Sequence, residues 1–228
     1  MANLYGPRIV TDGLVLHLDA ANRKSYPGTG TSWNDLSGNG NNSTLINGPA
    51  YNTNKRGYIT FDGSNDYADF YAPNLGSITT VESFAYLDSS ILRMFMWWQY
   101  YDVYMSSGRL GYNTGNSDVY GLSASAVSSL GAFNNWTHYV FEMVAYPASY
   151  TSNKIYINGV SQTLSQQLGS ENSGGKNFNS GNGRISGWRA NTNYPTTMNV
   201  ASFRIYNRAL SQSEITNNYN ALKGRFAL

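Results

Sequence analysis

Short stretches in which apolar and polar residues alternate recur along the chain, and turn-forming residues separate them. Near the start, Leu14, Leu16 and Leu18 alternate with other residues, which is the period of a strand with one buried face. Further on, the pair Asn158-Gly159 lies between two alternating arms and favours a tight β-hairpin. Roughly a dozen such strands with regular turns predict an antiparallel β-sandwich.

The last alternating stretch, residues 199–206, leads directly into a predicted helix. Ser211 and Glu214 have the spacing of a capping box, in which the side chain of each residue accepts a hydrogen bond from the backbone N–H of the other. Gly224 suits the left-handed residue that ends many helices. We therefore expect a strand and a short helix that close the fold, with residues 14–19 as the partner of the strand.

Length and composition favour one domain with an unusual surface. A β-sandwich often extends to the length of this 228-residue chain, and strand patterning continues throughout. Aromatic residues make up 14% of the chain and charged residues only 12%, so Asn, Ser, Thr, Gly and Tyr must supply much of the surface. Such a composition resembles that of adaptable binding surfaces, although a β-rich chain with many turns explains it equally well.

Charge and hydropathy exclude several classes of partner. The net charge is +2 with no long basic run, so nucleic acid is not expected as a partner. The sequence lacks cysteine, which removes disulfides and thiol chemistry. The start has neither the charged segment nor the apolar core of a signal peptide, and no apolar run is long enough for membrane insertion. Synthesis in the cytoplasm without a signal peptide is therefore expected.

Seven segments carry a family resemblance through their order and spacing. They are GLVLHLDAAN (13–22), SYPGTGTSWNDLSGNGNNSTLINGP (25–49), ITFDGSNDYADF (59–70), TVESFAY (80–86), WTHYVF (136–141), KIYINGV (154–160) and SFRIYNRALSQSEITNNYNA (202–221). Together they resemble the laminin-G-like, concanavalin A-like jelly-roll family. The resemblance implies an all-β fold, an antiparallel β-sandwich with a short C-terminal α-helix.

The two ends of the chain carry a narrower resemblance. The GPRIVTDGL start and the KGRF tail are similar to those of bacteriophage virion proteins, in which such domains serve as capsid decoration, fibre or tail parts. The predicted organisation is an N-terminal arm (1–12), a jelly-roll domain (13–223) and a C-terminal tail (224–228). Apolar residues without an obvious place in the sandwich would attach the arms to neighbouring virion proteins: Leu4, Tyr5, Ile9, Phe226 and Leu228.

Carboxylates do not form the pattern of a glycan-cleaving enzyme. Relatives that hydrolyse β-glucans place two carboxylates on one strand as acid and nucleophile. The four glutamates of this chain form no such set, and the protein is expected to be non-enzymatic; they are Glu82, Glu142, Glu171 and Glu214.

Calcium is an open question, and no cofactor is required. Asp62, Asn65 and Asp66 form an oxygen-rich cluster in a loop of the kind from which calcium-binding relatives draw their ligands. The chain departs from the family at Ala201 and Ser202, where an Asp-Glu pair often precedes the RIYN strand. That departure weakens any metal site carried over by the resemblance.

One late loop combines an aromatic ring with directed hydrogen-bonding groups, as glycan recognition requires. Its candidate residues are Trp188, Arg189, Asn191, Asn193 and Tyr194. Two functions follow as hypotheses. In the first, the domain is displayed on a virion and binds other virion proteins or cell-surface glycans, with homo-oligomerisation left open. In the second, it is a free, extracellular lectin, with or without calcium.

Overall fold

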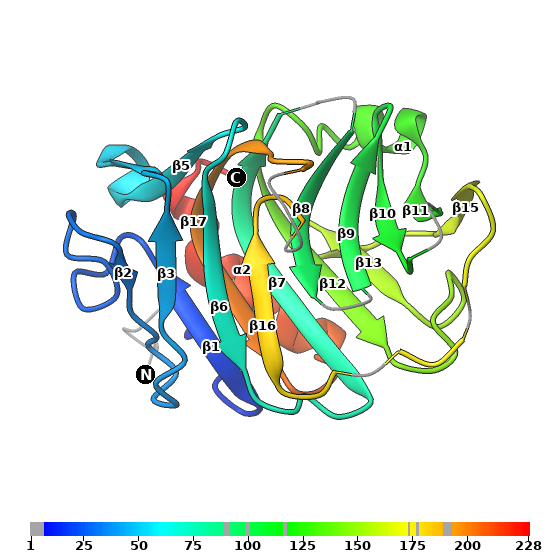
Figure 1. Ribbon diagram of the computed structural model, residues 1–228, viewed down its shortest axis with the longest axis horizontal. Coiled ribbons are helices and arrows are strands. Elements are labelled where there is room, and N and C mark those ends of the chain that lie inside the picture. Colours follow the sequence, from blue (N-terminus) through cyan, green and yellow to red (C-terminus); the bar gives the residue numbers. More distant parts are fainter. Residues whose placement is uncertain are drawn as a thin grey trace, which may run out of the picture.

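The computed structural model describes residues 7–88, 92–98, 101–115, 118–172, 174–176, 178–188 and 193–228. Two antiparallel sheets pack face to face, which confirms the predicted antiparallel β-sandwich (Figure 1). No helix in this described part of the chain has the length and apolar character that a membrane-spanning helix needs.

Sheet A, the rear layer in Figure 1, contains eight strands. In spatial order they are β14 (Val160–Ser161), β13 (Lys154–Ile157), β12 (Trp136–Val144), β7 (Ile78–Leu87), β17 (Thr197–Tyr206), β5 (Tyr58–Asp62) and β4 (Ala50–Asn52), with β1 (Leu14–Asp19) also paired to β17.

Sheet B, the front layer, contains nine strands. In spatial order they are β15 (Ser165–Leu168), β11 (Val119–Leu122), β10 (Arg109–Asn113), β9 (Tyr101–Ser106), β8 (Leu92–Trp98), β16 (Gly181–Ile185), β6 (Tyr67–Ala72), β3 (Ser43–Ile46) and β2 (Ser32–Trp33).

Strand β17 lies inside sheet A and is paired along both of its edges. One edge pairs with β7, and the other edge pairs first with β5 and then with β1. Leu16 lies opposite Ile205 and Leu18 opposite Phe203, so the apolar faces of the first and last strands coincide. The predicted pairing of these two strands is confirmed.

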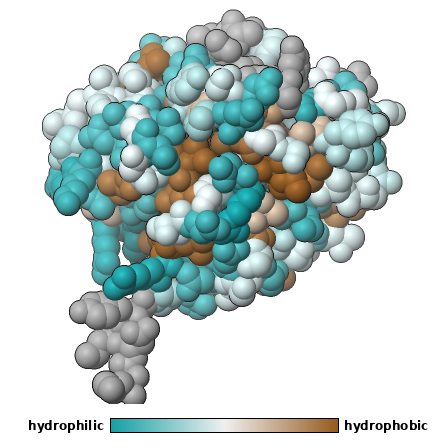
Figure 2. Space-filling view, turned by 90° about the horizontal axis from the view of Figure 1, so that it is seen from below, coloured by the Kyte–Doolittle hydropathy of each residue, from teal (hydrophilic) through white to brown (hydrophobic). Residues whose placement is uncertain are grey.

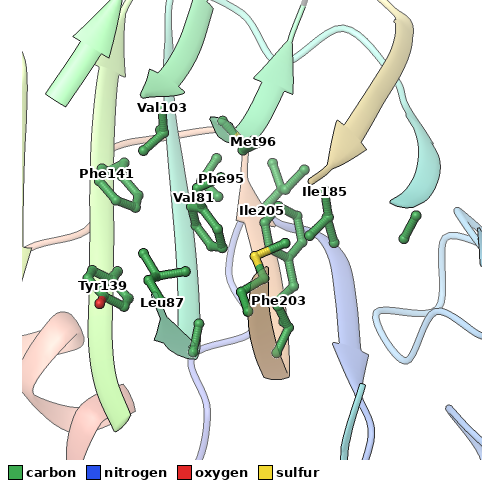
Figure 3. Close-up of a cluster of buried hydrophobic side chains, with 14 of the residues drawn as sticks. Val81, Leu87, Phe95, Met96, Val103, Tyr139, Phe141, Ile185, Phe203 and Ile205 are labelled. Carbon is green, nitrogen blue, oxygen red and sulfur yellow. The ribbon is translucent and has the colours of Figure 1, made fainter. Parts of the chain in front are cut away.

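The core fills the space between the two sheets (Figure 3). Phe95 of sheet B lies 5.9 Å from Phe141 and 6.4 Å from Phe203 of sheet A, measured between ring centroids. All three rings are fully buried. Each contributes about 2 to 3 kcal/mol through the apolar area that it removes from water.

Helix α2 (Gln212–Leu222) covers the outer face of sheet A (Figure 1). It begins with the predicted capping box, in which Glu214 N donates to Ser211 Oγ and Ser211 N donates to Glu214 Oε2. Ile215 packs into a buried cluster with Val140 of β12 and Tyr206 of β17. The helix therefore closes the face of sheet A that the core does not use.

A buried polar network also ties α2 to sheet A. Glu82 lies 2.5 Å from His138 Nε2 and 3.2 Å from Arg204 Nε, and it accepts from Asn218 Nδ2 at 2.8 Å. All four residues are fully buried. Burial alone would raise the pKa of Glu82, but Arg204, His138 and Asn218 lower it below its usual value. Asn218 Oδ1 accepts from Val10 N, so the network also holds the N-terminal segment.

The C-terminal tail packs on sheet A, and two expectations about it are wrong. Gly224 is not left-handed, because the chain continues from α2 into a 3-10 turn, η2 (Lys223–Arg225). Phe226 does have a place in the sandwich, since it is 5% exposed and stacks on Phe84 and Trp136 at 4.9 and 4.7 Å. The extra turn carries the Phe226 ring onto the sheet.

The segment between residues 20 and 56 contains more structure than its turn-rich sequence indicated. Strands β2, β3 and β4 lie there, followed by a 3-10 turn, η1 (Asn54–Arg56). Elsewhere in the chain, a short helix, α1 (Ala124–Ser129), is capped at its N-terminus by the side chain of Ser123. The predicted Asn158-Gly159 hairpin joins β13 and β14, with positive φ at both residues.

Candidate glycan-binding site

The loop that follows β16 presents Trp188 at the surface. Ser186 and Gly187, with φ angles of 71° and 79°, turn the chain away from the strand. Ser186 N donates to Phe95 O and Trp188 N donates to Asn193 O, both at 3.0 Å, so the loop is fixed at its start and returns on itself. Trp188 is 37% exposed. Its backbone is therefore held while part of its indole faces solvent.

Arg184 connects this loop to sheet B. It lies directly opposite Asp69 of β6, and its Nε and Nη2 donate to the two Asp69 carboxylate oxygens at 2.8 and 3.3 Å. Its Nη1 donates to Trp188 O at 3.2 Å. The guanidinium carbon also lies 3.6 Å from the centre of the Tyr67 ring, within cation–π range. Arg184 is thus a rigid bridge between the sheet and the tryptophan.

The outer face of β6 supplies further polar and aromatic groups beside this bridge. Ala68 and Phe70 point into the core, so Tyr67, Asp69 and Tyr71 point outward from the same strand. Tyr71 is 50% exposed. Sequence reasoning missed these residues, although the alternation in residues 67–71 was a signal for one shared face.

The structure brings three of the five predicted loop residues to this face. Asn193 is exposed and accepts from Trp188 through its carbonyl. The ring of Tyr194 lies edge-on to Tyr104 of β9, with centroids 6.1 Å apart. Burial, with Tyr194 and Asp102 nearby, raises the pKa of Tyr104 to about 12. Arg189 and Asn191 lie outside the described residues.

Comparison with known protein families assigns the chain to a superfamily. A family model described as the concanavalin A-like lectin/glucanases superfamily, Laminin_G_3, matches residues 62–216, which is more than half of the chain. This chain belongs to the concanavalin A-like lectin/glucanase superfamily. No curated protein matches the sequence.

Solved structures with the same fold are distant in sequence. The binding domain of Paraclostridial Mosquitocidal Protein 1 is 17% identical, with a TM-score of 0.64, over 92% of this chain and 52% of that one. The ligand binding domain of botulinum neurotoxin serotype D, in complex with N-acetylneuraminic acid, is 14% identical, with a TM-score of 0.64, over 92% and 51%. A mutant Trypanosoma rangeli sialidase displaying trans-sialidase activity is 14% identical, with a TM-score of 0.63, over 96% and 35%. This member of the superfamily therefore spans about half or less of the length of these chains.

The superfamily includes glucanases, in which a pair of carboxylates performs hydrolysis, whereas the glutamates of this member bind other groups of the protein. Glu82 lies in the buried network, and Glu142 pairs with Lys154 at 2.9 Å. Glu171 accepts from Tyr150 N at 2.9 Å, and Glu214 caps α2. Each of the four glutamates thus contacts another group of the protein.

Asp102 is a further carboxyl group, on β9, that sequence reasoning did not single out. It is 7% exposed, and burial together with the nearby Asp118 raises its pKa well above the usual value. Asp118 is fully buried and accepts from Thr114 N and Thr114 Oγ1 at 3.0 and 2.9 Å. Neither carboxyl group is presented to solvent as an acid and nucleophile would be.

The predicted calcium ligands do not fit a calcium site well. Asp62 Oδ1 already accepts from the backbone N–H groups of Ser64 and Asn65, and these contacts lower its pKa. Asp66 is 5% exposed, its Oδ2 accepts from Asp62 N, and burial raises its pKa. Among the described residues, no three His, Cys, Asp or Glu side chains gather to hold a metal ion.

The predicted attachment residues differ in their surroundings. Ile9 is half-buried and Leu228 is 41% exposed, whereas Phe226 is buried against sheet A. Leu4 and Tyr5 lie outside the described residues. Phe226 is therefore not available for contact with a neighbouring protein.

Proposed function

We propose that this chain is a non-catalytic interaction domain that binds glycans on the outer face of sheet B, at the Trp188 loop. One observation carries the proposal: Trp188 is partly exposed while its backbone is held by Asn193 and Arg184. An exposed indole on a backbone held in this way can stack on the apolar face of a sugar, and less backbone freedom is lost when the sugar binds.

Polar groups beside the ring suit the hydroxyl groups of a sugar. The Asp69 side chain is 36% exposed although Arg184 binds both of its oxygens, so a lone pair remains open to a hydroxyl donor. Asn193 is exposed on the other side of the loop, and Tyr71 offers a second exposed ring on β6. An aromatic platform with few directed polar groups is the usual chemistry of a carbohydrate site.

The likeness to a ligand binding domain solved with N-acetylneuraminic acid supports carbohydrate as the ligand class. It does not select a sugar, because this chain covers 51% of that chain at 14% identity. The proposal therefore rests on the Trp188 loop, and calcium has no part in it because the Asp62 cluster fits the ion poorly.

We further propose that the domain is displayed on a virus particle, as the resemblance of its two ends to phage virion proteins implies. Figure 2 shows hydrophobic residues gathered in the middle of the face seen from below, with hydrophilic residues around them. A face of this kind supports a docking contact with another protein. Mass spectrometry of purified particles from the source should detect the chain, and its absence from them would leave the free lectin as the setting.

The glycan proposal is tested with Trp188→Ala and a matched control, Tyr146→Ala. Tyr146 is a 73% exposed aromatic residue on the loop after β12, so its loss should not affect this site. On a glycan array, the wild-type chain and Tyr146→Ala should retain the same sugars. Trp188→Ala should lose about 2 kcal/mol of binding, or more than tenfold in affinity. Equal binding by all three proteins, or a blank array, would contradict the proposal.

A further inference from the structure

We propose that a second site, on the helix side of sheet A, binds the anionic groups of an acidic polysaccharide. A surface hollow of about 410 Å³ lies between the end of β1, the η1 turn and the C-terminal end of α2. Three arginines line it, Arg23, Arg56 and Arg225, together with one acidic residue, Asp19. This site is separate from the Trp188 loop and goes beyond the function proposed above.

Arg225 and Asp19 neutralise each other and form the floor of the hollow. Arg225 Nη1 lies 3.0 Å from Asp19 Oδ1, and the two side chains are only 7% and 15% exposed. The other guanidinium nitrogens donate to Lys55 O and Gly57 O at 3.3 and 3.1 Å. Arg225 therefore has a structural role, and the positive charge available to a ligand must come from other residues.

Arg23 and Arg56 supply that charge. Arg23 donates to Pro27 O and lies 5.9 Å from the centre of the Tyr51 ring. Arg56 is exposed. Within the described ranges, neither arginine forms an ion pair with a carboxylate. The hollow thus carries two guanidinium charges that the protein itself does not balance.

The turn that carries Arg56 is held in place on both sides. Lys55 and Arg56 have φ angles of 52° and 68°, a conformation that non-glycine residues rarely adopt. Arg225 holds this turn by donating hydrogen bonds to the carbonyls of Lys55 and Gly57, on either side of Arg56. A Cβ atom on Gly57 would lie 2.6 Å from Ala20 O, so the turn fits closely against the end of β1. Arg56 is therefore presented from a fixed backbone.

Three lysines adjoin lining residues in sequence: Lys24, Lys55 and Lys223. Six of the 15 basic residues of the chain thus line the hollow or adjoin a lining residue in sequence, although the net charge is only +2. Guanidinium groups pair bidentately with carboxylate, sulfate and phosphate oxygens. Repeated anions along a sugar chain would match several cations at once.

A polysaccharide fits this surface better than a membrane does. The large apolar residue in the lining, Leu222, is half-buried, and none of the large exposed hydrophobic residues of the described chain lines the hollow, so its lining offers no exposed apolar side chain for insertion into a bilayer. The hollow is a local depression rather than a long basic stripe, which also distinguishes it from a nucleic-acid surface.

The test uses the full chain with the double variant Arg23→Gln and Arg56→Gln. Heparin and alginate serve as sulfated and carboxylated probes, and binding is measured by titration calorimetry at low and high salt. The wild-type chain should bind at least one probe, more weakly at high salt because ions screen the contact. The double variant should lose about tenfold or more in affinity, because two charge-assisted contacts are removed.

A charge-matched control is Arg109→Gln with Lys176→Gln, which removes two positive charges from β10 and from the loop before β16. This control should bind as the wild type does. Equal loss in both double variants, or absence of binding to either probe by the wild-type chain, would overturn the proposal. Arginine-dependent binding to phosphatidylglycerol vesicles with none to the polysaccharides would overturn it too, in favour of a lipid surface. Unchanged melting temperatures of the variants show that folding is intact.

Discussion

At the scale of single residues, His17 makes stability depend on pH. Burial and the charge of Arg204, which lies opposite it on β17, lower the pKa of His17 to about 4. In the unfolded chain the pKa is close to 6.5, so the unfolded state takes up a proton first as the pH falls. The protein should therefore lose stability between pH 6.5 and about pH 4.

The variant His17→Gln isolates this contribution. As the pH falls from 6.5 to about 4, the wild type should lose up to about 3 kcal/mol through His17. The variant should not lose this amount because glutamine does not titrate, so its free energy of unfolding minus that of the wild type should rise. Urea denaturation at several pH values measures the difference. A difference that stays constant with pH would show that His17 is protonated equally in both states.

The sequence can single out a residue by its own type, whereas it does not show a contact between residues that are distant along the chain. Trp188 was predicted because a tryptophan in a polar loop is visible in the sequence itself. Arg184 and Asp69 were missed, because their ion pair depends on the register of β16 against β6, 115 positions away. Long-range strand pairing of this kind has no local signal in one sequence.

Among the elements, the C-terminal tail stabilises the fold by packing on the outer face of sheet A. Phe226 stacks on Phe84 and Trp136, and Tyr219 and Leu222 of α2 pack against the same cluster. Phe226→Ala should cost about 3 kcal/mol, since it leaves a cavity beside two aromatic rings. Leu228→Ala, two residues further on and 41% exposed, is the control and should change stability by less than about 0.5 kcal/mol. Thermal unfolding compares the two, and equal effects would mean that the tail does not pack in solution.

Elements with a long alternating pattern or a distinct capping signal could be predicted. Strands β12 and β17, the hairpin of β13 and β14, and the cap of α2 are of this kind. Strands β2, β3 and β4 have two to four residues each and lie among Asn and Gly, so they show too few periods to be recognised. Their neighbours in the sheet, rather than their own sequence, determine that they are strands.

At the scale of the whole molecule, the two sheets have different outer faces. Helix α2 and the tail cover the outer face of sheet A, whereas the outer face of sheet B carries Trp188, Tyr67, Asp69 and Tyr71. A ligand that needs an exposed platform is therefore expected on sheet B. The anion hollow lies at the edge of the covered layer, so the two proposed sites should be occupied independently.

Removal of calcium should leave the molecule unchanged. Asp62 Oδ1 already accepts from two backbone N–H groups, and Asp66 is only 5% exposed with its Oδ2 accepting from Asp62 N, so few carboxylate oxygens remain for the ion. The melting temperature and the glycan-array profile should be the same with calcium and with a chelator. A fall in melting temperature on chelation, reversed by added calcium, would show that the Asp62 cluster binds the ion despite this geometry.

Nuclear magnetic resonance of the indole N–H groups shows whether a sugar contacts Trp188 on the outer face of sheet B. The chain has five tryptophans, of which Trp33 is fully buried, and Trp188→Phe assigns the signal of interest. During titration with the glycan that the array selects, the Trp188 signal should shift most and the Trp33 and Trp136 signals should remain in place. A titration that moves the Trp136 signal and leaves the Trp188 signal unchanged would rule out sugar binding at the Trp188 loop.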